Sequence, residues 1–224
     1  MQSALIVGAG SGLSAALARL FRKNNLRVTL AARDTAKLAA LCAETGAVAV
    51  ATDATQPADI ARLFAGIEPP DIVVYNASAR ARGAFTELAP DAVAHAIAVS
   101  AYGGFLVAQQ ALQRMLPRGT GAILFTGASA SVKGYPQSAP FAMGKFALRG
   151  LAQSLAREFS PQGIHIAHFV IDGGIRSATR PVPADKPDSL LDPDDIAAAY
   201  WHVINQPRSA WTWEVELRPW VERF

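Results

Sequence analysis

A glycine-rich turn near the start of the chain constrains the fold more than any other feature. An apolar run at residues 5–7 leads directly into residues 8–12, which read Gly-Ala-Gly-Ser-Gly, and a helical pattern begins at Leu13. Glycines let the backbone approach an anion closely, and the free N–H groups and positive dipole end of a helix favour negative charge. The turn predicts a pyrophosphate site for a dinucleotide, and a mere tight turn is the alternative.

Short strand-like runs alternate with longer helical patterns along all 224 residues. Such alternation is typical of βαβ units, and strands that are apolar throughout are expected where helices cover both faces of a sheet. We expect one α/β domain over residues 1–224, of the Rossmann type, with a doubly wound, mostly parallel seven-stranded sheet and helices on both faces. The expected strands span residues 4–7, 27–31, 47–51, 71–75, 122–126, 164–170 and 213–217. The expected helices span residues 13–24, 35–45, 57–65, 91–116, 139–159 and 193–205.

Residues 176–192 differ from the rest of the chain. They hold Pro181, Pro183 and Pro187 and show no periodicity, so they are expected to form a long loop. A loop of this length in a compact domain is often a lid or substrate loop, and an unstructured surface loop is the alternative.

Composition narrows the range of partners. The net charge is only +3, with no block of Lys or Arg, so a nucleic-acid partner is not expected. Apolar stretches are interrupted before the roughly 20 residues that a membrane span needs, and the N-terminus does not resemble a signal peptide. Cys42 is the single cysteine, which excludes an internal disulfide and favours a reducing, cytoplasmic setting. The expected partner is a small-molecule substrate.

The end of the second expected strand bears on which dinucleotide binds. An acidic side chain there would bond the ribose 2′-OH and select NAD, but this strand ends without one. Arg33 follows at once, and its guanidinium could pair with the 2′-phosphate of NADP. Asp34 is expected to cap the next helix. The sequence therefore favours NADP, with a solvated surface role for Arg33 as the alternative.

Several further segments occur in a fixed order. Asp53 follows the third expected strand, residues 75–78 read Tyr-Asn-Ala-Ser after the fourth, and residues 99–103 read Val-Ser-Ala-Tyr-Gly on a helix. With the glycine-rich turn, these segments resemble the short-chain dehydrogenase/reductase family over nearly the whole chain. Two residues of that family's first motif are replaced here: its threonine by Val7 and its last glycine by Ser14.

The resemblance implies a set of residues that contact the dinucleotide. Asp53 would bond the adenine ring, and Lys145 would hold the nicotinamide ribose. The expected cofactor-binding residues are Gly8, Gly10, Ser11, Gly12, Leu13, Arg33, Asp53, Ala54, Asn76, Ala77, Ser78, Lys145 and Ile175.

The resemblance breaks at the catalytic residues. The family's Tyr-x-x-x-Lys appears here as Phe141 to Lys145, its catalytic serine falls at Ala128, and its supporting asparagine falls at Ser100. In the family the tyrosine hydroxyl supplies a proton to the carbonyl oxygen, and Phe141 has no exchangeable proton. Of the four family residues only Lys145 remains, so the chain is expected to be an atypical member that lacks the catalytic tyrosine.

Two readings of function remain open. The first is an oxidoreductase with an altered proton route, for which the candidate catalytic residues are Lys145, Ser129 and Tyr135; Tyr135 is the best substitute acid, and a packed loop aromatic is the alternative. The second is a catalytically silent dinucleotide-binding sensor or partner subunit. In either case the long helices at residues 91–116 and 139–159 carry more apolar surface than one sheet face needs. The resemblance implies that they pair across a two-fold axis, as a homodimer or homotetramer.

Overall fold

The computed structural model describes residues 2–177 and 179–222. Its centre is a seven-stranded sheet in the order β3-β2-β1-β4-β5-β6-β9, and every neighbouring pair is parallel. The predicted doubly wound α/β fold is confirmed. The strands are β1 (Ser3–Val7), β2 (Arg27–Ala32), β3 (Val48–Ala51), β4 (Ile72–Tyr75), β5 (Gly121–Thr126), β6 (Ile164–Ile171) and β9 (Glu214–Leu217).

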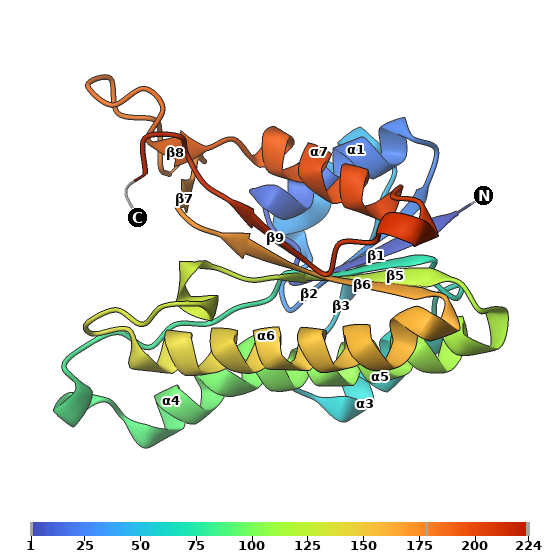
Figure 1. Cartoon of the computed structure of the whole chain (residues 1–224), viewed down its shortest axis with the longest axis horizontal. Coiled ribbons are helices and arrows are strands. Elements are labelled where there is room, and N and C mark those ends of the chain that lie inside the picture. The colour runs from blue at the N-terminus through green and yellow to red at the C-terminus, as the bar shows by residue number, and fades with distance from the viewer. Residues whose placement is uncertain (1, 178, 223–224) are drawn as a thin grey trace.

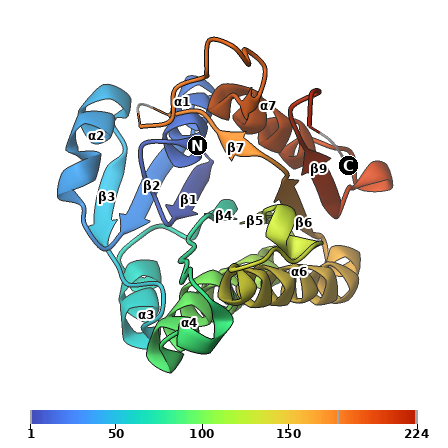
Figure 2. The same cartoon turned by 90° about the vertical axis from the view of Figure 1, so that its left-hand side faces the viewer.

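Helices cover both faces of the sheet (Figures 1 and 2). One face carries α1 (Leu13–Lys23), α2 (Ala39–Thr45) and α7 (Pro193–Ile204). The other carries α3 (Pro57–Ala65), α4 (Pro90–Ile97), α5 (Gly103–Met115) and α6 (Ala139–Phe159). Each face has its own hydrophobic cluster of buried side chains. The strands between them are apolar on both sides for this reason, as in β4, where all four residues are buried.

The long helix expected at residues 91–116 is present within one continuous helical run, Pro90–Arg118, but its hydrogen-bonding pattern changes midway. Residues Ala98–Tyr102 form a π-helical segment between α4 and α5. There the hydroxyl of Tyr75, on β4, donates a hydrogen bond to the main-chain carbonyl of Val99. Gly103 allows this approach, because a Cβ at that position would lie 2.3 Å from the Tyr75 oxygen. A contact from the sheet thus occupies a carbonyl that a regular α-helix would have used internally.

The same helical run is more apolar over its length than expected from the interrupted apolar stretches of the sequence. Pro90–Arg118 is long and apolar enough to cross a membrane by length and composition, with a mean hydropathy of 1.4 in its most apolar window. In this fold 44% of that window is buried and α5 packs against β4 and β5. Core helices of other proteins meet the same criterion.

The proline-containing loop is closed at its base. Strand β7 (Gly174–Ile175) pairs in parallel with β8 (Leu190–Leu191), and Arg176 forms an ion pair of 2.5 Å with Asp192. Figure 1 shows residues 179–189 extending away from the sheet beside β8. The loop therefore leaves and rejoins the domain near one point, next to the carboxyl edge of β6.

Candidate functional site

Two adjoining cavities lie at the carboxyl edge of the parallel strands, where ligands bind in open α/β sheets. The first has a volume of about 670 Å³ and the second about 300 Å³. Gly8, Gly10, Asn76 and Ser78 line both, so the two join along the glycine-rich turn and the end of β4.

The turn is shaped by Gly8. Its φ is +82°, and a Cβ there would lie 2.3 Å from the main-chain nitrogen of Ala77. Only glycine fits both the left-handed backbone and this close approach. The Gly8 amide donates to the carbonyl of Ala31 at 2.9 Å, which ties the turn to β2.

Ser14, one of the departures from the family motif, has a definite structural role. Its hydroxyl donates to the carbonyl of Gly8 at 3.3 Å and accepts from the side-chain amide of Asn76 at 2.8 Å. The serine therefore connects the turn, the start of α1 and the end of β4 through side-chain hydrogen bonds.

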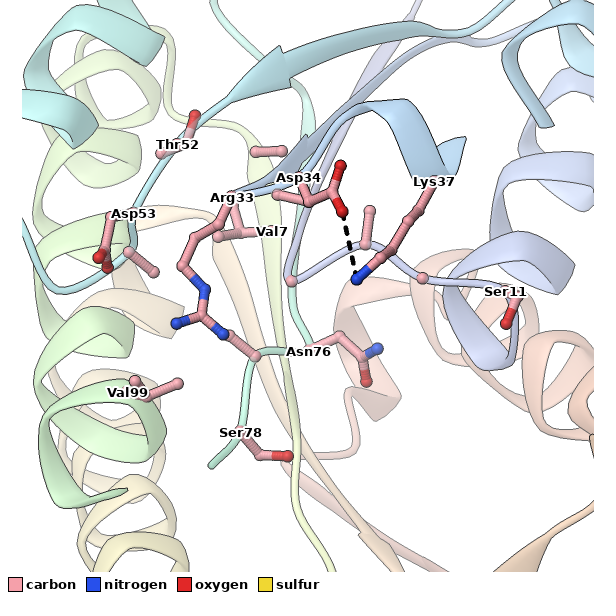
Figure 3. Close-up of a pocket in the computed structure, with 17 residues that line it drawn as sticks. Val7, Ser11, Arg33, Asp34, Lys37, Thr52, Asp53, Asn76, Ser78 and Val99 are labelled. Atoms are coloured by element: carbon pink, nitrogen blue, oxygen red, sulfur yellow. Dashed lines mark ion pairs between the residues drawn. The ribbon is translucent and has the colours of Figure 1, made fainter. Parts of the chain in front are cut away.

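The first cavity contains the predicted selectivity residue. Figure 3 shows the Arg33 side chain extending into it between Asp53, Val99 and Asn76. Among the residues that the structure describes, no carboxylate forms an ion pair with Arg33. Lys37, which also lines this cavity, is paired with Asp34 at 3.2 Å. Of the two cations that line this cavity, Arg33 is therefore the one without a carboxylate partner in the described part of the chain.

Asp53 lies in the same cavity. One of its carboxylate oxygens accepts hydrogen bonds from the amide and the hydroxyl of Thr55, at 2.9 and 2.8 Å. The carboxylate is therefore fixed in orientation. The first cavity brings together nine of the predicted cofactor-binding residues: Gly8, Gly10, Ser11, Arg33, Asp53, Ala54, Asn76, Ala77 and Ser78.

The other predicted cofactor-binding residues, Gly12, Leu13, Lys145 and Ile175, line the second cavity. Lys145, from α6, is 2% exposed and its ammonium donates to the carbonyl of Thr126 at 2.6 Å. Burial, together with the nearby charge of Arg80, lowers the pKa of Lys145 to about 7.

Phe141 and Ala128 occupy the second cavity as the motif spacing indicated. The Phe141 ring is buried, and the guanidinium carbon of Arg80 lies 4.1 Å from its centroid. Arg80 was not anticipated as a site residue. The available signal was its place, two residues beyond the Asn-Ala-Ser segment that follows the fourth strand.

Ser129 and Tyr135 do not line either cavity. Ser129 and Lys133 hydrogen-bond the carboxylate of Asp172; burial opposes the charge of that carboxylate, yet these bonds hold its pKa below the usual range. Tyr135 is half exposed and bonds to Lys133. The structure therefore does not bring these two hydroxyls to Lys145, and their catalytic roles stay predictions.

The histidines of the described residues do not form part of a metal-binding cluster. Within residues 2–177 and 179–222, no group of three or more His, Cys, Asp or Glu side chains could hold a metal ion. His168 is fully buried on β6 and contacts the carboxylate of Glu214 at 3.1 Å. Burial lowers the pKa of His168 to about 4, so the side chain is neutral at pH 7.

Comparison with known proteins places this geometry in context. A family model described as short chain dehydrogenase matches residues 2–182. An uncharacterized oxidoreductase of Staphylococcus aureus is 28% identical over 229 residues, which cover 96% of each protein. The crystal structure of a short-chain dehydrogenase from Rhodopseudomonas palustris has a TM-score of 0.86 and 31% identity, and covers 98% of this chain and 99% of that one. A metagenomic short-chain oxidoreductase in complex with NADP has a TM-score of 0.84 and 26% identity over 97% of both chains.

Proposed function

Because this chain belongs to the short-chain dehydrogenase family, we propose that it is an NADP(H)-dependent oxidoreductase of a small carbonyl compound or alcohol, with an altered proton-donating site. The observation that carries the proposal is the pair of joined cavities at the glycine-rich turn. One holds Arg33, which has no ion pair within residues 2–177 and 179–222, and the other holds a buried Lys145.

The residues present fit a dinucleotide. The N-terminus of α1 and residues 8–13 would bind the pyrophosphate, Asp53 would bond the adenine, and Arg33 would pair with a 2′-phosphate. Lys145 would hold the nicotinamide ribose and Ile175 would border the nicotinamide. The bound nicotinamide supplies hydride-transfer chemistry. NADP in the metagenomic relative supports this choice of cofactor.

The side chains that would supply a proton in the family are absent. Phe141 and Ala128 can neither donate nor accept a hydrogen bond through their side chains, and both line the second cavity. Lys145 has a pKa of about 7, so it can carry or release a proton near neutral pH. Its ammonium donates to Thr126. A reaction here would draw its proton through Lys145 or from water.

A silent dinucleotide-binding protein is the second candidate function. The specific observation in its favour is the buried Phe141 ring, which contacts Arg80 and occupies the position of the family's proton-donating tyrosine. As an enzyme or as a sensor, the protein would form a homodimer or homotetramer and would act in the cytoplasm.

Titration with NADPH, followed by assay with aldehydes, ketones and diketones, tests both candidates. NADPH binding with slow but measurable oxidation of NADPH supports the enzyme. Binding with no oxidation by any carbonyl compound supports the silent protein, and absence of NADPH binding contradicts both.

A further inference from the structure

We propose that Arg80 and the Phe141 ring form an anion site in the second cavity that binds the carboxylate of the substrate, so that the protein acts on oxo or hydroxy acids. This inference rests on the proposed function for the identity of the neighbouring cofactor. It goes beyond it in naming the chemical class of the substrate.

The stacking geometry is the first argument. The guanidinium carbon of Arg80 lies 4.1 Å from the Phe141 centroid, and the Lys145 ammonium lies 5.9 Å from the same point. A guanidinium at this distance from a ring face is held in orientation by a cation–π contact. Its N–H groups are left for a planar partner, because a guanidinium matches a carboxylate with two parallel hydrogen bonds.

The local fold holds the Arg80 backbone in place. Ser100, in the π-helical segment, is fully buried, and its hydroxyl lies 3.4 Å from the amide and 3.5 Å from the carbonyl of Ala79. These contacts fix the residue directly before Arg80. The segment after β4 is therefore anchored one residue before the cation, which directs the side chain toward α6.

The charge of the cavity is the second argument. Its lining has four cations, Arg80, Lys145, Arg176 and Arg180, and no Asp or Glu among the residues that the structure describes. Arg176 is already paired with Asp192. Arg80 has no ion pair within residues 2–177 and 179–222. The residue is exposed, but partial desolvation of its guanidinium, together with the charges of Arg82 and Arg180, lowers its pKa. An anionic group would relieve this unbalanced positive charge.

The proposed anion site at Arg80 is distinct from the sites expected for the cofactor phosphates. The pyrophosphate site is formed by the amides at the start of α1, and the 2′-phosphate site by Arg33 in the first cavity. Arg80 instead contacts Phe141, at the position where the family places the group that faces the substrate oxygen. The charge it meets there belongs to the substrate.

The chain offers a matched control for the experiment. Arg82 lies two residues beyond Arg80 in the same exposed segment and lines neither cavity. Isothermal titration would use protein saturated with NADP⁺, so that no turnover occurs. The probes are 2-oxobutanoate, 3-oxobutanoate and the methyl ester of each, and the variants are Arg80→Gln, Arg80→Lys and Arg82→Gln. NADP⁺ affinity is measured first for every variant.

We expect the acids to bind more tightly than their esters. Arg80→Gln should weaken binding of the acids by at least about tenfold. Arg80→Lys should weaken binding of the acids to an intermediate degree, because lysine keeps the positive charge but lacks the paired N–H donors of a guanidinium. Arg82→Gln should match the unmodified protein. Acids binding no better than esters, equal losses in Arg80→Gln and Arg82→Gln, or no binding of either acid at millimolar concentration would each overturn the proposal.

Two further outcomes keep this inference distinct from the proposed function. If the unmodified protein does not bind NADP⁺, the proposed function fails, and the same titration on cofactor-free protein then decides the anion site. If Arg80→Gln loses NADP⁺ affinity while Arg80→Lys keeps it, Arg80 serves the cofactor and the substrate assignment is wrong.

Discussion

The ammonium of Lys145 donates a 2.6 Å hydrogen bond to the main-chain carbonyl of Thr126, inside the second cavity. This contact ties the N-terminal third of α6 to the end of β5, while the side chain has almost no exposure. No carboxylate forms an ion pair with this lysine among the residues that the structure describes, and burial lowers its pKa to about 7, so its charge changes near neutral pH.

The first prediction concerns that charge. The ordinary lysine pKa of 10.5 falls to about 7 on folding, so between these values the unfolded chain binds a proton that the folded protein does not. The free energy of unfolding should therefore rise from pH 7 toward pH 10, with a slope of at most about 1.4 kcal/mol per pH unit from this group. Urea unfolding at several pH values would measure it. Lys145→Met should lack this part of the slope, and equal slopes in both proteins would contradict the assignment.

The second prediction concerns the cofactor. Arg33→Ala should weaken NADPH binding by about 10- to 100-fold and leave NADH binding unchanged, since only NADPH carries the 2′-phosphate. Calorimetry with both cofactors is the measurement. Lys37→Ala, which removes a cation already paired with Asp34, should have a smaller effect. Equal or tighter NADH binding by the unmodified protein, unchanged in Arg33→Ala, would show that Arg33 does not select the cofactor.

The third prediction separates folding from binding at the glycine-rich turn. Gly8→Ala should destabilise the protein by more than the roughly 1–2 kcal/mol of a left-handed backbone, because the new Cβ also meets Ala77. Gly10→Ala is the matched control: a Cβ there has nothing within 4 Å, so it should fold normally and weaken only NADPH binding. Thermal melts and NADPH titrations of the two variants distinguish these effects. Equal melting temperatures would refute the steric argument.

The fourth prediction concerns the missing hydroxyls. Ala128→Ser combined with Phe141→Tyr should raise carbonyl reduction, since a general acid typically contributes about 10²–10⁴ in rate. Cofactor affinity should change little, because tyrosine exceeds phenylalanine by one heavy atom. Ala128→Ser with Phe141→Leu is the control and should gain nothing. If the unmodified protein already works at a rate ordinary for its family, this account is wrong, and Tyr135→Phe should then abolish the activity.

The fifth prediction concerns assembly. Phe105 on α5 and Phe146 on α6 are 42% and 45% exposed, and Tyr102 and Met143, each three residues earlier, are also exposed. Light scattering should show a dimer or tetramer, and the double variant Phe105→Glu, Phe146→Glu should shift it toward the monomer. The control Phe85→Glu changes an exposed residue in a turn before α4 and should leave the oligomeric state unchanged. A monomer at micromolar concentration for the unmodified protein would contradict the expectation.

The sequence predicted all seven main strands to within one residue at each end. Their apolar runs are short, and each is bounded by turn residues or a helical pattern, so local composition marks the ends. The change to a π-helical pattern at Ala98–Tyr102 was not predictable in this way. The Tyr75 hydroxyl contacts this segment at Val99 from a strand more than twenty residues earlier, and local composition does not reveal that contact.

The candidate site was predicted unevenly for a similar reason. The residues of the glycine-rich turn, Arg33 and Lys145 follow from position along the chain, and the structure brings them to joined cavities. Ser129 and Tyr135 are close in sequence to residues that line the second cavity, but they hydrogen-bond Asp172 and Lys133 and line neither cavity. Arg80 was missed because its importance depends on a ring 61 positions away, and its place two residues beyond the Asn-Ala-Ser segment does not reveal that contact.

The π-helical segment has a consequence for chains of different length. One residue corresponds to about 100° of rotation around a regular α-helix, and a π turn takes up one extra residue by widening. Deleting one residue within Ala98–Tyr102 should therefore restore a regular helix and leave the same face of α5 toward the sheet. Gly103 and Gly104, whose lack of side chains admits Tyr75 and Leu148, would keep their positions. Relatives with one residue fewer here could pack the same small residues of α5 on the same sheet.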